Sequence, residues 1–234
     1  MKLRELIKNL SIIEMNADAE LEISGVSYDS RKTEKGDMFV AIRGFEADGH
    51  KFIPKAVENG AAVILCEEKP SCDIPYVLVS DSRYGLAIVS RDFFGDPASE
   101  MTMIGITGTS GKTSSSYLIK HMLESKLDAK VGLIGTNGNM IGDELLHTEH
   151  TPESYELHKL FRHMADSGCT HVVMEVSSHS LTLERVAGIH FDVALYTNLS
   201  QDHLDFHGTM EEYAAAKRKL FSMCSLGCFN LDDA

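Results

Sequence analysis

The chain has 234 residues, of which 43% are hydrophobic and 24% are charged, so it is long enough for one or two well-packed domains. Its formal net charge of −13, from 22 basic and 35 acidic side chains, argues against general affinity for nucleic acid or for an anionic membrane. The sequence shows no long apolar run and no signal peptide, and its five cysteines form no CxxC pair. We therefore expect a cytoplasmic protein with reduced thiols.

The first part of the chain predicts a small α/β unit. Short apolar runs at 38–42, 61–66 and 76–79 predict strands, and they alternate with predicted helices at 3–10, 52–58 and 83–93. Glycine, aspartate and proline then follow one another in 95–99, which is typical of a boundary between domains. We place the two domains at 1–98 and 99–234.

Residues 101–116, MTMIGITGTSGKTSSS, predict a phosphate-binding loop between a strand and a helix. Gly108 and Gly111 allow the backbone amides to turn toward an anion, while Lys112 supplies a positive charge and Thr113 a hydroxyl for Mg²⁺. The common pattern GxxxxGK[ST] has glycine where this chain has Ile106, so the loop is a variant. The motif predicts a site for a nucleoside triphosphate.

The second part alternates regularly between strands and helices. Predicted strands at 103–107, 130–135, 171–177 and 191–198 indicate a parallel sheet covered on both faces. One predicted helix has Thr151 as its cap and Pro152 in its first turn, ends at Gly168, and has an apolar face formed by Leu157, Leu160, Phe161 and Met164. Another begins with a capping box, Thr209 and Glu212, and carries Tyr213, Lys217 and Leu220.

Polar residues at the strand ends are candidates for chemistry, because ligands bind beyond the carboxyl ends of parallel strands. Glu175 lies in an otherwise apolar strand, where it is either a metal ligand or a strand-end carboxylate bonded to a neighbouring lysine. The segment 200–208 contains Asp202, His203, Asp205 and His207, which suit either Mg²⁺ and phosphate binding or an ordinary hydrogen-bonded turn. The absence of HExxH gives no support to zinc hydrolase chemistry.

Several segments together resemble the Mur ligase family. TGTSGKTS, MEVSSHSL, TNLSQDHLDFHGT and EEYAAAK are similar to its central ATPase domain, in the order that the family uses. VSYDSR at 26–31, GDMFV at 36–40 and GFEADGH at 44–50 resemble its uridine-nucleotide-binding domain, most closely in the MurE branch. The resemblance implies an α/β fold, with a small N-terminal UDP-MurNAc-binding domain followed by a parallel-sheet P-loop ATPase domain.

The implied activity is that of an ATP-dependent amide ligase of peptidoglycan precursor synthesis. It would add diaminopimelate or lysine to UDP-MurNAc-L-Ala-D-Glu after ATP has phosphorylated the terminal carboxylate. Phosphoryl transfer depends mainly on positioning and charge neutralisation, which a glycine-rich loop, a lysine and Mg²⁺ provide. We expect the protein to be a monomer.

The resemblance also assigns the ATP and metal residues. Lys112 would contact the β- and γ-phosphates within a loop formed by Gly108, Thr109, Ser110, Gly111, Lys112, Thr113 and Ser114. Mg²⁺ would be bound by Thr113, Glu175 and His203, and Lys217 matches a lysine that the family carbamylates to N6-carboxylysine. The residues alone favour another interpretation of Lys217, a solvated helix face, because Arg218 and Lys219 follow it.

The substrate contacts are likewise carried over from the family. The uridine-binding positions match Tyr28, Ser30, Phe45, Glu46 and Ala47, and the muramoyl-peptide contacts match His150, Thr151, Ser177 and Arg185. An arginine suits a substrate carboxylate or pyrophosphate, whereas Ser30 and Thr151 also suit turn and helix capping. Three positions depart from the family: Ser110 replaces asparagine, His150 replaces threonine, and Leu183 stands where some members have glutamine.

The resemblance covers the whole chain but only about the first half of the family's architecture. We therefore expect an incomplete central domain, and we expect the 234-residue chain to lack ligase turnover alone. One alternative is a nucleotide-binding module without catalysis. Another is a MurF-like or folylpolyglutamate-type ligase that uses a different carboxylate.

Overall fold

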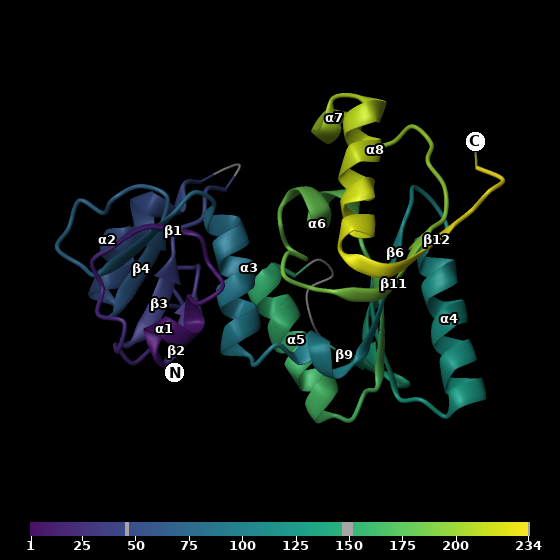
Figure 1. The fold of residues 1–234 in the computed structure, drawn as a ribbon, viewed down its shortest axis with the longest axis horizontal. Coiled ribbons are helices and arrows are strands. Elements are labelled where there is room, and N and C mark those ends of the chain that lie inside the picture. The colour runs from purple at the N-terminus through teal and green to yellow at the C-terminus, as the bar shows by residue number, and fades with distance from the viewer. Residues whose placement is uncertain (45–46, 147–151, 234) are drawn as a thin grey trace. The chain divides into compact units, whose positions relative to one another are not determined.

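The computed structural model describes residues 1–44, 47–146 and 152–233 (Figure 1). They divide into two compact units, Met1–Gly95 and Asp96–Ala234, here called unit 1 and unit 2. The division falls within the breaker-rich segment, slightly before the boundary predicted after residue 98. Both units have mostly parallel sheets with helices, which confirms the predicted α/β class.

Within its described residues, unit 1 is built on a five-stranded sheet in the order β1-β5-β4-β3-β2. The strands from β2 to β5 are parallel, and β1 is antiparallel to β5 at the edge. Their bounds are β1 (Ile12–Met15), β2 (Gly25–Ser27), β3 (Asp37–Val40), β4 (Val63–Cys66) and β5 (Tyr76–Val79). Sequence patterns predicted β3, β4 and β5 but missed β1 and β2, whose segments are short and, in β1, exposed.

Helices pack on both faces of this sheet. Phe39, Ile64 and Cys66 form one buried cluster with α2 (Ile53–Glu58), while α3 (Ser82–Phe93) contacts β2, β3 and β4. Helix α3 begins where predicted because Asp81 caps it, accepting a 2.9 Å hydrogen bond from the Tyr84 backbone N–H. Helix α1 (Leu3–Leu6) is shorter than the predicted helix at 3–10.

In the part of unit 2 that the structure describes, a seven-stranded sheet has the order β12-β11-β6-β10-β7-β8-β9. The strands are β6 (Thr102–Thr107), β7 (Val131–Gly135), β8 (Gly138–Ile141), β9 (Glu144–Leu146), β10 (His171–Glu175), β11 (Phe191–Tyr196) and β12 (Cys224–Phe229). The four predicted strands, β6, β7, β10 and β11, are parallel as expected. The sequence did not indicate β8 and β9, which extend the sheet antiparallel from the edge of β7. Gly138 and Gly142 have positive φ angles of 113° and 56°, which allow the tight turns of this hairpin.

The core of unit 2 confirms that helices cover both faces of the sheet. Met103 and Val172 belong to the cluster that contains the apolar residues of α5 (Ser154–Asp166), whereas Ile104 and Val173 belong to the cluster beneath α4 (Lys112–Leu127). This alternation follows from the period of two along each strand. The other helices are α6 (Ser178–Thr182), α7 (Leu204–His207) and α8 (Met210–Arg218).

Two predicted helix starts have different outcomes. The apolar face of α5 is buried as predicted, but the helix begins at Ser154 with Glu153 as its N-cap, so Pro152 lies before the helix and not in its first turn. The predicted cap, Thr151, lies outside the described residues. In α8 the Thr209 hydroxyl accepts a 3.2 Å hydrogen bond from the Glu212 N–H, as the capping motif predicted.

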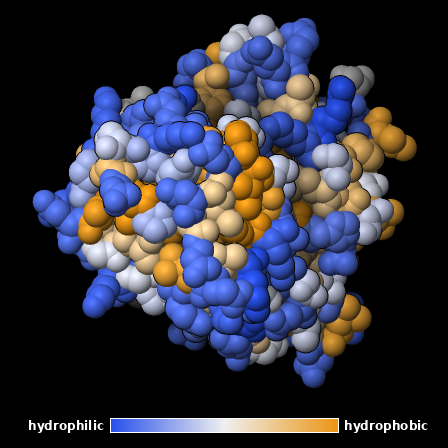
Figure 2. Space-filling view, turned by 60° about the vertical axis from the view of Figure 1, so that its left-hand side comes forward, coloured by the Kyte–Doolittle hydropathy of each residue, from blue (hydrophilic) through white to orange (hydrophobic). Residues whose placement is uncertain are grey.

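Hydrophilic residues cover most of the face seen in Figure 2, and hydrophobic residues gather in groups between them. Among the residues that the structure describes, no helix has both the length and the apolar character needed to cross a bilayer.

Candidate functional site

The predicted phosphate loop connects β6 to α4 at the carboxyl end of the unit 2 sheet. Gly108 has φ +147° and Gly111, the N-cap of α4, has φ +84°, conformations that L-residues rarely adopt. A Cβ atom at Gly108 would also overlap the hydroxyl of Thr197. The two glycines are therefore required by the backbone at this turn.

The segment after β11 holds the loop through hydrogen bonds. The Thr109 N–H donates to the Asn198 carbonyl at 2.8 Å, and the Ser110 N–H donates to Asn198 Oδ1 at 3.0 Å. The Ser110 carbonyl accepts from Thr197 Oγ1 at 2.7 Å and from Asn198 Nδ2 at 3.1 Å. Thr197 and Asn198 were absent from the predicted site, although polar residues at a strand end were a signal that could have found them.

Lys112 lies folded over the loop. Its Nζ donates to the carbonyls of Gly108 and Thr109, at 2.9 Å in each case. Burial lowers the pKa of Lys112, and the negative charges of Glu175 and Asp202 partly oppose this shift. The ammonium group thus lies at the loop that the sequence assigned to phosphate.

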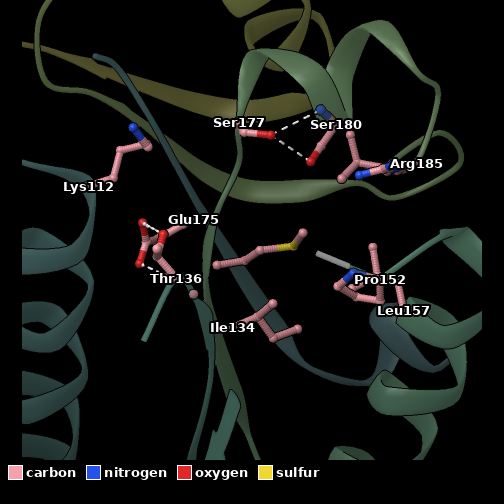
Figure 3. A pocket seen from close by; sticks show the side chains of 12 residues that line it. Lys112, Ile134, Thr136, Pro152, Leu157, Glu175, Ser177, Ser180 and Arg185 are labelled. Atoms are coloured by element: carbon pink, nitrogen blue, oxygen red, sulfur yellow. Dashed lines mark hydrogen bonds between the residues drawn. The ribbon is translucent and has the colours of Figure 1, made fainter. Parts of the chain in front are cut away.

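Glu175 lies at the end of β10, facing the start of α4. Its carboxylate accepts from Thr113 Oγ1 at 3.0 Å. It also accepts from the backbone N–H and the hydroxyl of Thr136, at 3.1 Å each (Figure 3). Two threonines supply these bonds, whereas one of the two predictions for Glu175 was a bond to a neighbouring lysine. Thr113 and Glu175 therefore place two oxygen groups side by side, and Thr136 is a contact that the sequence did not indicate.

Lys217 is buried, with only 3% of its surface exposed. Its interpretation as part of a solvated helix face is wrong, because of the three basic residues only Arg218 and Lys219 are exposed. Lys217 shares the buried face of the α8 region with Tyr213 and Leu220. Its Nζ donates to the Gly108 carbonyl at 2.8 Å. Burial, with a further effect from the charge of Lys112, lowers the pKa of Lys217 to about 7.

The histidines of α6 and α7 form a group of packed rings. The His203 ring is exposed and lies 4.9 Å from that of His179, edge to face, while buried His207 shares a 2.8 Å hydrogen bond between Nε2 and Ser178 Oγ. Burial lowers the pKa of His179 and of His207, and the neighbouring His203 adds to both shifts. Within the described residues no three His, Cys, Asp or Glu side chains are placed to hold a metal ion. The 200–208 segment does not form such a site by itself.

A cavity of about 70 Å³ adjoins Lys112 and Glu175 within unit 2. Figure 3 shows Lys112, Glu175 and Thr136 on one side, with Ser177, Ser180 and Arg185 on the other. Ser177 Oγ accepts a 3.0 Å hydrogen bond from the Ser180 N–H, and Arg185 Nε donates to Glu153 Oε1 at 2.7 Å. The predicted Ser177 and Arg185 thus line the same cavity as Lys112.

The remaining predicted substrate residues lie either in unit 1 or outside the described part of the chain. Tyr28 and Ala47 lie in unit 1, as does the buried Ser30, whose carbonyl accepts a 2.7 Å hydrogen bond from Asn59 Nδ2. Four further predicted residues lie outside the described part of the chain: Phe45, Glu46, His150 and Thr151.

Two family models match the sequence. The Mur ligase middle domain matches residues 106–234, and the model of the Mur ligase family, catalytic domain, matches residues 22–110. A UDP-N-acetylmuramoyl-L-alanyl-D-glutamate--2,6-diaminopimelate ligase of Clostridium tetani is 46% identical over 239 residues, covering 100% of this chain and 49% of the relative.

Solved structures of Mur ligases are also similar to this chain. A UDP-N-acetylmuramoyl-L-alanyl-D-glutamate--2,6-diaminopimelate ligase is 32% identical with a TM-score of 0.87, covering 100% of this chain and 48% of that one. The MurF ligase of Thermotoga maritima in complex with ADP is 26% identical with a TM-score of 0.58, covering 91% of this chain and 47% of the other. The chain spans about half the length of the curated relatives that it matches.

Proposed function

Since this chain belongs to the Mur ligase family, we propose that it supplies the nucleotide-sugar and ATP sites of a ligase that extends UDP-MurNAc-L-Ala-D-Glu. The third residue added is diaminopimelate, the amino acid named for the C. tetani relative. ATP phosphorylates the terminal carboxylate of the substrate, and the incoming amine then displaces phosphate. The observation that carries the proposal is the glycine loop at the end of β6, with Lys112, Thr113, Glu175 and Lys217 around it.

In this proposal the loop binds the triphosphate through its backbone and through Lys112. The positive φ angles of Gly108 and Gly111 create a turn at the N-terminus of the sixteen-residue helix α4, where amides and the helix dipole favour an anion. Lys112 Nζ exchanges its two carbonyl partners for phosphate oxygens. The contribution of these groups is positioning and charge neutralisation.

The residues near the loop fit Mg²⁺, which prefers oxygen ligands and usually keeps water and phosphate in its shell. Thr113 Oγ1 and Glu175 Oε2 are 3.0 Å apart at the first turn of α4, and we assign them to the metal together with His203. When bound, Mg²⁺ neutralises phosphate charge. The Glu175 carboxylate also orients the Thr113 hydroxyl.

We further propose that Lys217 is carbamylated. Its amine is held in place by the Gly108 carbonyl, and a pKa of about 7 leaves much of it neutral, the form that adds CO2 with loss of a proton. The product is N6-carboxylysine, whose negative charge supports the metal. Burial of a lysine without a carboxylate bond is costly, and the modification would replace the ammonium with an anion that Mg²⁺ and the nearby charge of Lys112 could balance.

The nucleotide-sugar contacts are proposed at Tyr28, Ser30 and residues 45–47 of unit 1, and at residues 150 and 151, Ser177 and Arg185 of unit 2. Arg185 is suited to an anionic substrate group, because a guanidinium presents several donors and Glu153 occupies its Nε. We propose a cytoplasmic monomer, and the five free cysteines support a reducing compartment.

Calorimetry tests the proposal. We expect the chain to bind Mg-ATP, and to bind UDP-MurNAc-L-Ala-D-Glu in preference to the corresponding tripeptide, the substrate class of a MurF-like enzyme. Lys112→Ala should weaken Mg-ATP binding by roughly tenfold or more, the effect of losing a charged hydrogen bond. Lys126→Ala, in the exposed last turn of α4, is the matched control. The proposal would be overturned if the unsubstituted chain bound neither Mg-ATP nor UDP-MurNAc-L-Ala-D-Glu.

A further inference from the structure

Tyr213 contacts the proposed ATP site at two residues, Thr109 and Lys217, and has not yet been assigned a role there. It lies on α8 and is 1% exposed. Its hydroxyl is 3.1 Å from Thr109 Oγ1 in the phosphate loop, and either atom can be the donor. A side chain on α8 thus reaches the loop between β6 and α4.

The hydroxyl of Thr109 joins three segments. Besides Tyr213, it accepts a 3.0 Å hydrogen bond from the Ser200 N–H and lies 3.2 Å from the Ser200 carbonyl. The loop is therefore anchored on one side by the segment after β11 and on the other by α8.

The ring of Tyr213 contacts the buried lysine. Lys217 Nζ lies 4.3 Å from the ring centroid, the geometry of a cation–π contact. The same Nζ donates to the carbonyl of Gly108, the residue before Thr109. The ring also packs at 5.1 Å against that of His207, which fixes its plane. A tyrosine side chain has only two rotatable torsions before its hydroxyl, so it fixes the separation between loop and lysine at low entropic cost.

We propose that Tyr213 is a positioning residue of the ATP site, which holds the phosphate loop through Thr109 and holds Lys217 against the Gly108 carbonyl. This inference rests on the proposed function. Tyr213 acts through its neighbours and is not assigned a contact with ATP. Its hydroxyl sets the position of the loop, and its ring sets the position of the lysine.

The test separates hydroxyl from ring. Tyr213→Phe keeps the ring and removes the bond to Thr109, and we expect it to weaken Mg-ATP binding by roughly 2- to 12-fold in calorimetry, the range for one hydrogen bond. Tyr213→Leu also removes the ring that packs beside the end of the Lys217 side chain and should weaken binding further. Tyr117→Phe, on the exposed side of α4, is the control and should bind like the unsubstituted chain.

A double-mutant cycle distinguishes positioning from general packing. In a Thr109→Ala chain, Tyr213→Phe should cause little additional loss of Mg-ATP affinity, because the bond between the two hydroxyls is already lost. Thermal unfolding is measured in parallel. If Tyr213→Phe binds Mg-ATP as tightly as the unsubstituted chain, whatever its melting temperature, the inference is wrong but the proposed function is not. The same holds if the effects of Tyr213→Phe and Thr109→Ala on affinity simply add. No Mg-ATP binding by the unsubstituted chain would overturn the proposed function and the inference together.

Discussion

At the scale of single residues, Lys217 shows how burial changes the chemistry of a side chain. Three successive basic residues, 217–219, predicted a solvated surface. The second and third are exposed, but the first, Lys217, is buried. The four-residue spacing from Tyr213 places it on the inner face of α8, and that spacing was visible in the sequence. The prediction nevertheless followed the charged neighbours and not this spacing, because lysine side chains are rarely buried. The environment that results lowers the pKa of the amine to about 7.

This pKa predicts how stability depends on pH. The folded pKa lies below the ordinary lysine value of 10.5, so between these values the unfolded chain binds more protons and stability rises with pH. Below about pH 7 both states are protonated and the cost of burying the charge is constant. In CO2-free buffer, the melting temperature of the natural chain relative to Lys217→Met should therefore increase from pH 7 to pH 10. A difference that stays constant over this range would contradict the shift.

The two loop glycines provide a matched pair of substitutions. Gly111→Ala meets no atom within 4 Å and adds only the strain of a positive φ, so it should cost about 1 kcal/mol of unfolding free energy. Gly108→Ala has the same kind of strain and in addition overlaps the Thr197 hydroxyl, so it should cost more than about 2 kcal/mol. Urea denaturation of both variants measures the difference. Equal losses of unfolding free energy in the two variants would show that the backbone at residue 108 can move away from Thr197 without cost.

At the scale of elements, sequence patterns found the segments with an apolar run or a clear period and missed the short segments that are exposed or of mixed polarity. The apolar face of α5 and the strands β6, β7, β10 and β11 follow from periodicity and from breakers at their ends. The hairpin formed by β8 and β9 has only seven strand residues and mixed polarity, and its pairing depends on the neighbouring edge of β7. Likewise, the contacts of Thr136 and Tyr213 depend on which elements the sheet brings together, which no local pattern contains.

Helix α8 offers a test of an element through its cap. Thr209→Ala removes the acceptor of the Glu212 N–H and should lower the unfolding free energy by about 1 kcal/mol. Thr209→Ser keeps the hydroxyl and is the control, with an expected loss of a few tenths at most. Because α8 carries Tyr213 and Lys217, Mg-ATP affinity should fall in the alanine variant as well. Unchanged denaturation of Thr209→Ala would show that the cap adds nothing to stability.

At the scale of the whole molecule, the chain has two units, and the protein contacts of the proposed ATP site described above come from unit 2. Residues 96–234 produced alone should therefore bind Mg-ATP within about threefold of the full chain, a difference well below the 1.4 kcal/mol of a tenfold change. Calorimetry of the two chains measures this. A loss of more than tenfold would show that unit 1 contributes to nucleotide binding.

The exact boundary can be tested in the same way. Ala98 is buried in the main core of unit 2, next to buried Pro97, so a chain of residues 99–234 lacks part of that core. We expect it to melt at a lower temperature than residues 96–234. Equal melting temperatures would favour the boundary that the sequence predicted, after residue 98.

The way in which Ser110 is held bears on how freely this loop can vary during evolution. Its described contacts with Thr197 and Asn198 run through its own backbone N–H and carbonyl. A position held in this manner keeps its conformation when its side chain is exchanged for another small polar one. Exchange of Ser110 for another small polar residue should therefore leave the loop in place, whereas exchange of Thr197 or Asn198 removes hydrogen bonds that hold it.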